Sequence, residues 1–233
     1  MASNGGYLEY VYQLNAGDYM MDFKVNTVDL DDIIPSNRND LELKWSVNLP
    51  STEKSIENER MYSTVYFKYL NDEVDYLSET KDDEESLSGK AQWIGLKHQF
   101  FSSVLISNNG FEKPISVKTT TKEGSTQFVK NLEVEASLAY NHNSKESIPL
   151  QFYFGPNHYE TLSSYNMDLE RMIPLGWGIF RWVNKYAVIP IFNWLDNSIT
   201  NYGIIILIMT FIIKMALAPF TLKAYKSQAK MKV

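Results

Sequence analysis

A stripe of polar side chains in the apolar C-terminal part of the sequence is the first group that could do chemistry. Its four members fall within about 60° of one another at 100° per helical residue: Thr210, Lys214, Thr221 and Tyr225. Lys214 is the single charge between residues 202 and 220, and a lysine inside hydrocarbon costs about 2.5–3.5 kcal/mol on insertion scales. The stripe favours a wet cavity or a protein partner around Lys214. The alternative is an ammonium that snorkels to the headgroups.

Other chemistry is poorly supported by the residue types. The sequence has no cysteine, so it has no disulfide, no cysteine-based zinc site and no thiol nucleophile. His98, His142 and His158 are widely separated and lack metal-ligand spacing. Acidic pairs such as Asp31-Asp32 and Asp82-Asp83 are interpreted as loop charges. We therefore expect no enzyme activity, no metal and no cofactor.

The element that carries the polar stripe is predicted to span a membrane. The run from residue 202 to residue 220 would cover about 28 Å as a helix, close to the ~30 Å hydrocarbon core. Pro219 removes a backbone donor near its end and predicts a kink there. Four lysines follow, at positions 223, 226, 230 and 232. The positive-inside rule then predicts a cytoplasmic C-terminus, with residues 1–201 on the other side.

The charge of the 201 residues before this helix excludes one class of partner. They hold all 28 acidic residues against 17 basic ones, a formal charge of −11. Such a body repels phosphates, so no nucleic-acid binding is expected. It would have to cross the membrane, yet residues 1–6 (MASNGG) do not form a signal peptide. The sequence also stops inside a basic helical stretch. We therefore interpret it as a fragment cut at both ends.

The acidic body is predicted to be an antiparallel β-sandwich or barrel. Eight segments rich in Tyr, Phe, Val, Ile and Thr predict strands, at residues 7–14, 19–28, 41–49, 62–70, 93–106, 115–121, 132–140 and 150–154. Turn formers separate several of them, at residues 15–18, 108–110, 123–124 and 141–144. The acidic run 81–85 is interpreted as a solvated loop. Gly155-Pro156 is expected to end the last strand, and residues 159–172 to form one short helix.

Residues 177–195 predict an amphipathic helix lying in the outer membrane interface. Its polar residues share about half of the helical circumference, and the residues that fit the interface are three tryptophans and two cations: Trp177, Trp182, Trp194, Arg181 and Lys185. Pro190 predicts a kink. The alternative is a helix packed only on its own domain.

Residues 201–231 (NYGIIILIMTFIIKMALAPFTLKAYKSQAKM) resemble the second transmembrane helix of YidC-type membrane protein insertases. The shared features are a glycine before an isoleucine-rich run, Thr-Phe-Ile, a basic residue, a proline near the exit, and Ser-x-x-Lys-Met. Gly176-Trp177 at the start of an interfacial helix, and Gly155-Pro156 at the end of a periplasmic domain, are similar too. The resemblance covers essentially the whole chain.

The resemblance implies a galactose mutarotase-like β-supersandwich over residues 1–174. An interfacial helix at 175–200, a transmembrane helix at 201–222 and the start of a cytoplasmic helical region at 223–233 are implied to follow. It also implies a groove, facing cytoplasm and lipid, in which a basic residue attracts acidic tails of nascent membrane proteins. Lys214 matches that residue and Thr210 a groove-side threonine, with Thr221 and Pro219 on the same helix. The Sec translocon and the ribosome are implied partners.

Two departures and two rival hypotheses accompany this interpretation. The family's usual groove residue is arginine, and the compact, strongly hydrated ammonium of Lys214 pairs less readily in bidentate fashion. The family's groove also needs further helices that these 233 residues do not contain. One rival is a membrane-anchored carbohydrate-binding or mutarotase-like domain with an ordinary anchor. The other is a structural protein whose β body docks partners.

Overall fold

The computed structural model describes residues 5–30, 33–71 and 73–231, with side chains as far as Gln228. Asp31 and Asp32, interpreted above as loop charges, lie outside the described residues, as do residues 1–4 and Lys232. The chain divides into two compact units, residues 1–173 and 174–233. We call them the β unit and the helical unit.

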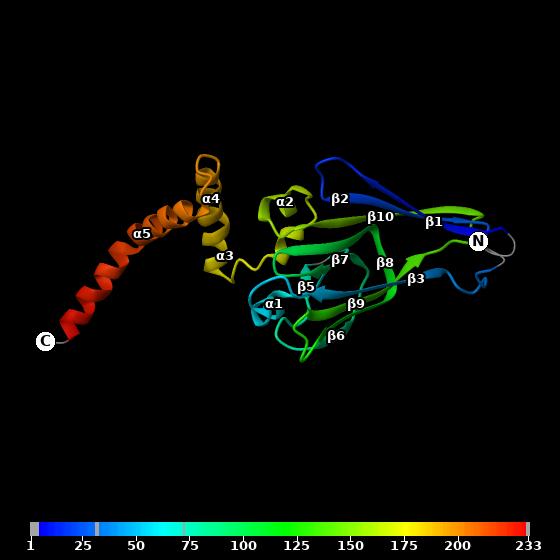
Figure 1. Cartoon of the computed structure of the whole chain (residues 1–233), viewed down its shortest axis with the longest axis horizontal. Helices are drawn as coiled ribbons and strands as arrows, with labels where there is room; N and C mark the ends of the chain where they lie inside the picture. Colours follow the sequence, from blue (N-terminus) through cyan, green and yellow to red (C-terminus); the bar gives the residue numbers. More distant parts are fainter. Residues whose placement is uncertain (1–4, 31–32, 72, 232–233) are drawn as a thin grey trace. The chain divides into compact units, whose positions relative to one another are not determined.

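The β unit is built from antiparallel strands, as predicted (Figure 1). A first sheet has the order β1-β2-β10-β8-β7-β4-β5, and a second sheet joins β3, β9, β8 and β6. The strand bounds are β1 Tyr7–Leu14, β2 Met20–Val28, β3 Asp40–Pro50, β4 Thr64–Tyr69, β5 Val74–Tyr76, β6 Asp83–Ser86, β7 Ala91–Lys97, β8 Phe101–Thr121, β9 Phe128–Ala139 and β10 Lys145–Pro156.

Strand β8 belongs to both sheets. Its residues 101–106 pair with β10 and β7 in the first sheet, and residues 112–121 pair with β9 in the second. Between them, Ser107 to Gly110 stand opposite the single residue Gln92 of β7, a large bulge. Gly110 has a φ of +79°, which glycine adopts without steric cost.

This arrangement corrects two sequence predictions. Residues 108–110 bend a continuing strand and do not form a turn between strands, because their neighbours remain paired on both sides of the bulge. Residues 93–106 form two strands and not one: β7 and β8 meet in a hairpin at residues 98–100, where the His98 amide donates to the Phe101 carbonyl at 2.9 Å. That turn contains no Gly, Pro, Asn or Asp, so the usual sequence signal is missing.

Short elements account for the other differences. Helix α1 (Ile56–Tyr62) precedes β4 where the sequence predicted strand from residue 62, and Ser55 caps it by accepting from the Asn58 amide at 3.3 Å. The acidic run at 81–85 is partly strand β6, because an edge strand keeps its carboxylates in water while its backbone pairs with β8. Residues 159–172 form α2 (Tyr159–Ser164) and the 3₁₀ helix η1 (Leu169–Met172), separated where Asn166 and Asp168 adopt positive φ.

Two hydrophobic cores use the two faces of the first sheet. The core between the sheets contains alternate residues of their strands, including Phe67, Leu105 and Leu132. The core on the outer face contains Trp93, Val104 and Tyr153, and α2 and η1 cover it with Leu162, Leu169 and Met172. Successive side chains of a strand point to opposite faces of the sheet, so β7 and β8 each contribute residues to both cores.

The helical unit begins with α3 (Ile179–Val183), a π turn η2 (Asn184–Val188) and α4 (Ile189–Asp196). Pro190 lies in the first turn of α4, so the π turn falls at the place where the sequence predicted a kink. Helix α5 (Tyr202–Met231) follows and continues through Pro219. Among the described residues, only the segment Tyr202–Gln228 of α5 is long and apolar enough to cross a membrane.

The cover formed by α2 and η1 predicts a large cost for truncating Met172. This side chain is fully buried, and its sulfur lies 3.0 Å from the position that a Cβ at Gly95 of β7 would take. We expect Met172→Ala to lower the free energy of unfolding by about 2–5 kcal/mol. Met61→Ala, at a side chain that is 48% exposed on α1, should change it by less than about 0.5 kcal/mol. Urea unfolding followed by circular dichroism measures both; equal effects would contradict the packing described here.

Candidate functional site

The polar stripe of α5 lies along one helix, as the sequence spacing requires. Thr210, Lys214 and Thr221 are exposed in the structure. The Thr210 hydroxyl donates to the Ile206 carbonyl at 2.8 Å, and the Thr221 hydroxyl to the Leu217 carbonyl at 3.0 Å. The threonines are therefore satisfied by their own helix, whereas the Lys214 ammonium and the Tyr225 hydroxyl have no hydrogen bond to a described residue and need a partner or water.

Helix α4 covers another face of α5. Leu195 of α4 packs with Ile205 and Met209 of α5 in a small buried cluster, with Phe192 and Ile208 partly buried beside it. At 100° per residue the centre of this covered face lies about 150° from the centre of the polar stripe. The α4 contact reaches only the first turns of α5, and from Thr210 to Gln228 every residue except the half-buried Ile212 is exposed, Lys214 among them.

The predicted interfacial residues are exposed from just before α3 to α4. Trp177, Trp182 and Trp194 are 84%, 67% and 70% exposed, and Arg181 and Lys185 are exposed as well. The Trp182 and Tyr186 rings lie 4.7 Å apart, and the Lys185 ammonium lies 5.8 Å from the centre of the Tyr186 ring. Such a concentration of exposed tryptophans and cations is typical of a helix in the headgroup region.

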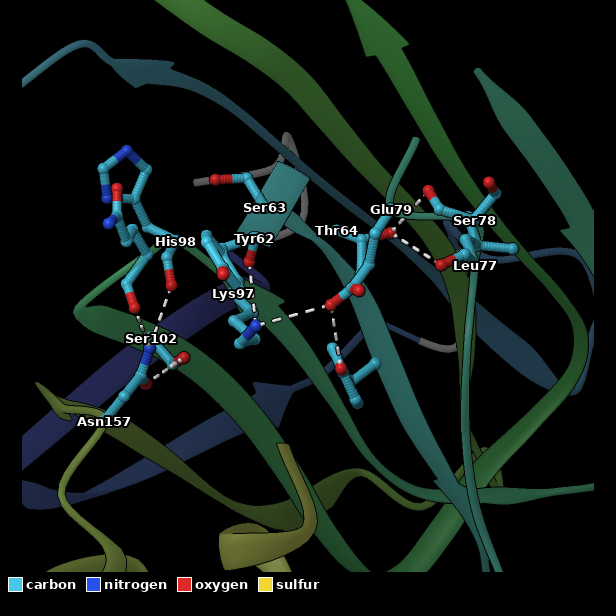
Figure 2. Close-up of polar contacts among 12 residues, drawn as sticks. Tyr62, Ser63, Thr64, Leu77, Ser78, Glu79, Lys97, His98, Ser102 and Asn157 are labelled. Atoms are coloured by element: carbon cyan, nitrogen blue, oxygen red, sulfur yellow. Dashed lines mark hydrogen bonds and ion pairs between the residues drawn. The ribbon is translucent and has the colours of Figure 1, made fainter. Parts of the chain in front are cut away.

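A buried polar cluster in the β unit was not predicted from the sequence (Figure 2). Lys97 of β7 has a side chain that is 3% exposed, and its ammonium donates to the Tyr62 carbonyl at 2.8 Å and pairs with Glu79 at 3.6 Å. The Tyr66 hydroxyl donates to the same carboxylate at 3.2 Å. Burial lowers the pKa of Lys97, and the charge of Glu79 opposes that shift.

Lys130 of β9 completes this cluster from the second sheet. Its ammonium donates to the Ser63 and Glu79 carbonyls, both at 2.9 Å. Burial lowers the pKa of Lys130 as well, and the negative charges of Asp82 and Glu79 oppose that shift. Both lysine side chains are occupied by backbone carbonyls and are closed to solvent, so the cluster fastens strands together and leaves little access to a substrate.

A second buried pair joins α1 to the β7–β8 hairpin. Glu59 is fully buried, and its carboxylate accepts from the Ser51 hydroxyl at 2.6 Å and from the Thr52 amide at 2.8 Å. Burial alone raises the pKa of Glu59, but the hydrogen bonds outweigh it and hold that pKa below its usual range. His98 Nε2 lies 3.4 Å from the carboxylate. Burial lowers the pKa of His98, and Glu59 opposes only part of that shift.

The three histidines have separate local roles in the structure. His98 is packed beside Glu59, and its carbonyl accepts from the Asn157 side-chain amide at 2.9 Å (Figure 2). His142 Nε2 lies 2.9 Å from the Arg38 carbonyl, and His158 Nδ1 lies 2.9 Å from the Thr161 hydroxyl. Among the described residues no three histidine or acidic side chains gather as a metal site would require. Lys214 on α5 remains the predicted groove residue, exposed and without a partner among the described residues.

Comparison with known proteins finds matches that cover both units. Residues 1–189 match the family described as the YidC periplasmic domain. The chain is 40% identical over 237 residues to the membrane protein insertase YidC of Parabacteroides distasonis, covering 98% of this chain and 37% of that protein. It is 40% identical over 242 residues to the protein of the same name from Azobacteroides pseudotrichonymphae, covering 100% and 39%. The chain thus spans less than two-fifths of the length of these relatives.

The position of His98 predicts how stability depends on pH. Its folded pKa is below the unfolded value of about 6.5, so the unfolded state binds more protons as the pH falls below that value, and stability decreases. We expect the urea midpoint to fall between pH 7.5 and pH 5.5, and His98→Gln to flatten this dependence. His158→Gln, at an exposed residue, should keep the wild-type slope. An unchanged slope in His98→Gln would show that another group titrates.

Proposed function

Because the chain belongs to the YidC family of membrane protein insertases, we propose that the protein carrying it inserts nascent membrane proteins into the inner membrane. In this proposal the β unit is periplasmic, α3 and α4 lie at the outer interface, and α5 crosses the bilayer towards the cytoplasm. The exposed Lys223 and Lys226 near the end of α5 support this direction. Insertion makes and breaks no covalent bond, so the work needs a binding surface and not a catalytic group.

The observation that carries the proposal is the lone exposed cation in the apolar part of α5. An ammonium facing acyl chains would cost about 2.5–3.5 kcal/mol on insertion scales. The same ammonium facing a hydrated hollow keeps its water, and in a medium of lower dielectric than bulk water it attracts a carboxylate strongly. Lys214 is exposed and is the single charge between residues 202 and 220, which suits a surface that receives an acidic partner.

We assign to Lys214 the transient attraction of acidic residues in the tail of a client protein. The hydrated stripe shortens the apolar distance that a polar tail must cross, because part of the path is then lined by water and hydroxyl groups. Thr210 and Thr221 flank the cation on this path. Pro219 lies two residues before Thr221, where its missing amide leaves one helix hydrogen bond unmade. The Sec translocon and the ribosome remain predicted partners.

Reversing the charge of Lys214 tests the proposed attraction. In the full-length protein, we expect Lys214→Glu to abolish the insertion of clients with acidic translocated tails, because a carboxylate now repels the tail, while Lys214→Arg retains it. Clients with neutral tails should insert normally. Lys54→Glu is the matched control, since it reverses the same charge at an exposed residue of the β unit, outside α5. Protease protection of the tail measures insertion, and normal insertion of acidic tails by Lys214→Glu would remove this mechanism.

The proposed interfacial position of α3 is tested by a spin label. The sequence contains no cysteine, so Trp182→Cys and Leu207→Cys each introduce a single labelling site into this chain. In lipid bilayers we expect the label at 182 to collide with both oxygen and a polar nickel reagent, as at headgroup depth. The label at 207 should collide with oxygen alone. A label at 182 as open to nickel as one at the exposed Met61 of the β unit would place α3 in water.

A further inference from the structure

Helix α3 and the π turn η2 belong to a stretch of chain that carries cations and no acidic residue. Residues 172–195 contain neither Asp nor Glu, although the whole chain has 28 acidic residues. The cations of this stretch are Arg181 and Lys185, and both are exposed. No salt bridge joins either of them to a described carboxylate. Two exposed cations without a counter-charge are suited to bind an anion from outside the described chain.

Arg181 and Lys185 lie on one side of their helix, one turn apart. At 100° per residue a separation of four residues places them about 40° from each other, and only the last of these four steps falls in the π turn, which begins at Asn184. The rings of Trp182 and Tyr186, also four residues apart, lie 4.7 Å from each other, so such pairs are neighbours across this junction. Neighbours of this kind have Cβ atoms about 5–6 Å apart. One group of the size of a phosphate can therefore contact both cations.

The side chains around this cation pair divide into a polar and an apolar side. Asn184, next to the pair, donates to the Leu175 carbonyl at 2.9 Å and is thereby bound within its own chain. Ile179 and Val183 are 77% and 47% exposed, and their centre lies about 160° from the centre of the pair at 100° per residue. The segment therefore offers positive charge to an anion on one side and exposed apolar surface on the other.

We propose that Arg181 and Lys185 together bind the phosphate of an anionic phospholipid at the outer surface of the bilayer. The guanidinium of Arg181 can donate two parallel hydrogen bonds to phosphate oxygens, and the ammonium of Lys185 adds a second positive charge. A zwitterionic lipid binds less well, because the ammonium in its own headgroup repels both cations. This binding requires the proposed interfacial position of α3, and it adds the class of lipid that is bound there.

A lipid fits this surface better than an acidic peptide does. A peptide carboxylate could pair with Arg181 or Lys185, but the apolar side would then stay in water, where Ile179, Phe180 and Val183 are exposed. A phospholipid supplies both parts in one molecule. Its phosphate meets the cations, and its acyl chains lie below the phosphate, where they cover the apolar side and remove it from water.

Photocrosslinking of the full-length protein to lipids in vesicles tests this proposal. The photoreactive residue p-benzoylphenylalanine replaces Tyr186, which is 57% exposed and whose ring centre lies 5.8 Å from the Lys185 ammonium. The vesicles contain equal amounts of anionic phosphatidylglycerol and zwitterionic phosphatidylcholine with the same acyl chains, and mass spectrometry identifies the captured lipid. We expect phosphatidylglycerol adducts to outnumber phosphatidylcholine adducts about fivefold, as the attraction of a basic residue to an anionic surface gives.

Removing the two charges should remove the lipid preference. Arg181→Gln combined with Lys185→Gln should capture both lipids equally. Lys223→Gln combined with Lys226→Gln is the matched control, because it removes the same charge from exposed residues of α5 and should leave the ratio unchanged. Equal capture before the charges are removed, or an unchanged ratio in the first double variant, would overturn the proposal and leave the interfacial position of α3 intact. The absence of any lipid adduct at position 186 would overturn both.

Discussion

The bend in β8 is the constraint on which the β unit depends. One strand can serve two sheets only if its backbone changes direction while its amides and carbonyls keep partners on both sides. The four residues opposite Gln92 provide that change, and pairing resumes on either side of them. A Cβ at Gly110 would come within 3.2 Å of the Lys90 Cβ, so the bend also needs a residue without a side chain. Both hydrophobic cores take their facing residues from the strands that this bend aligns.

Electrostatics is arranged differently in the two units. In the β unit, the enclosed Lys97 of β7 and Lys130 of β9 donate to carbonyls at the end of α1 and in the loop that contains Glu79, so they tie these two strands to both segments. In the helical unit Lys214 is exposed and its neighbours Thr210 and Thr221 bond to their own helix. The first arrangement resists change because breaking one contact leaves a buried charge unpaired. The second leaves a charge available to something outside the chain.

The sequence predicts the class of the fold well, because hydrophobic periodicity reports local environment. Strand β1 begins and ends where the pattern predicts, and the apolar helix from Tyr202 is found in the structure. Predictions failed where long-range pairing overrides local signals. Asn108-Asn109-Gly110 is a strong turn signal, yet here it bends a strand, and the turn at residues 98–100 carries no such signal. The buried lysines were missed because their partners are carbonyls far away in the sequence.

The candidate site, too, could be predicted only in part from the sequence. Spacing alone places Thr210, Lys214 and Thr221 on one face of a helix, because that needs only the helical period. The finding that α4 covers a different face requires knowing that the chain turns back between Asp196 and Tyr202. The pairing of Glu59 with His98 likewise depends on α1, whose start is marked in the sequence only by Ser55 and the acidic first turn.

The π turn at Asn184–Val188 has a consequence for how α3 and α4 relate along their common axis. A π turn holds about one residue more than an α turn, so it acts as a single-residue insertion that shifts the angular phase of everything after it by about 100°. The angle between the Trp182 and Leu195 side chains around the helix axis therefore differs by that shift from the angle in an uninterrupted α-helix. The helix formed by α3, the π turn and α4 can therefore expose Trp182 before the π turn and pack Leu195 against α5 after it, while its backbone stays continuous.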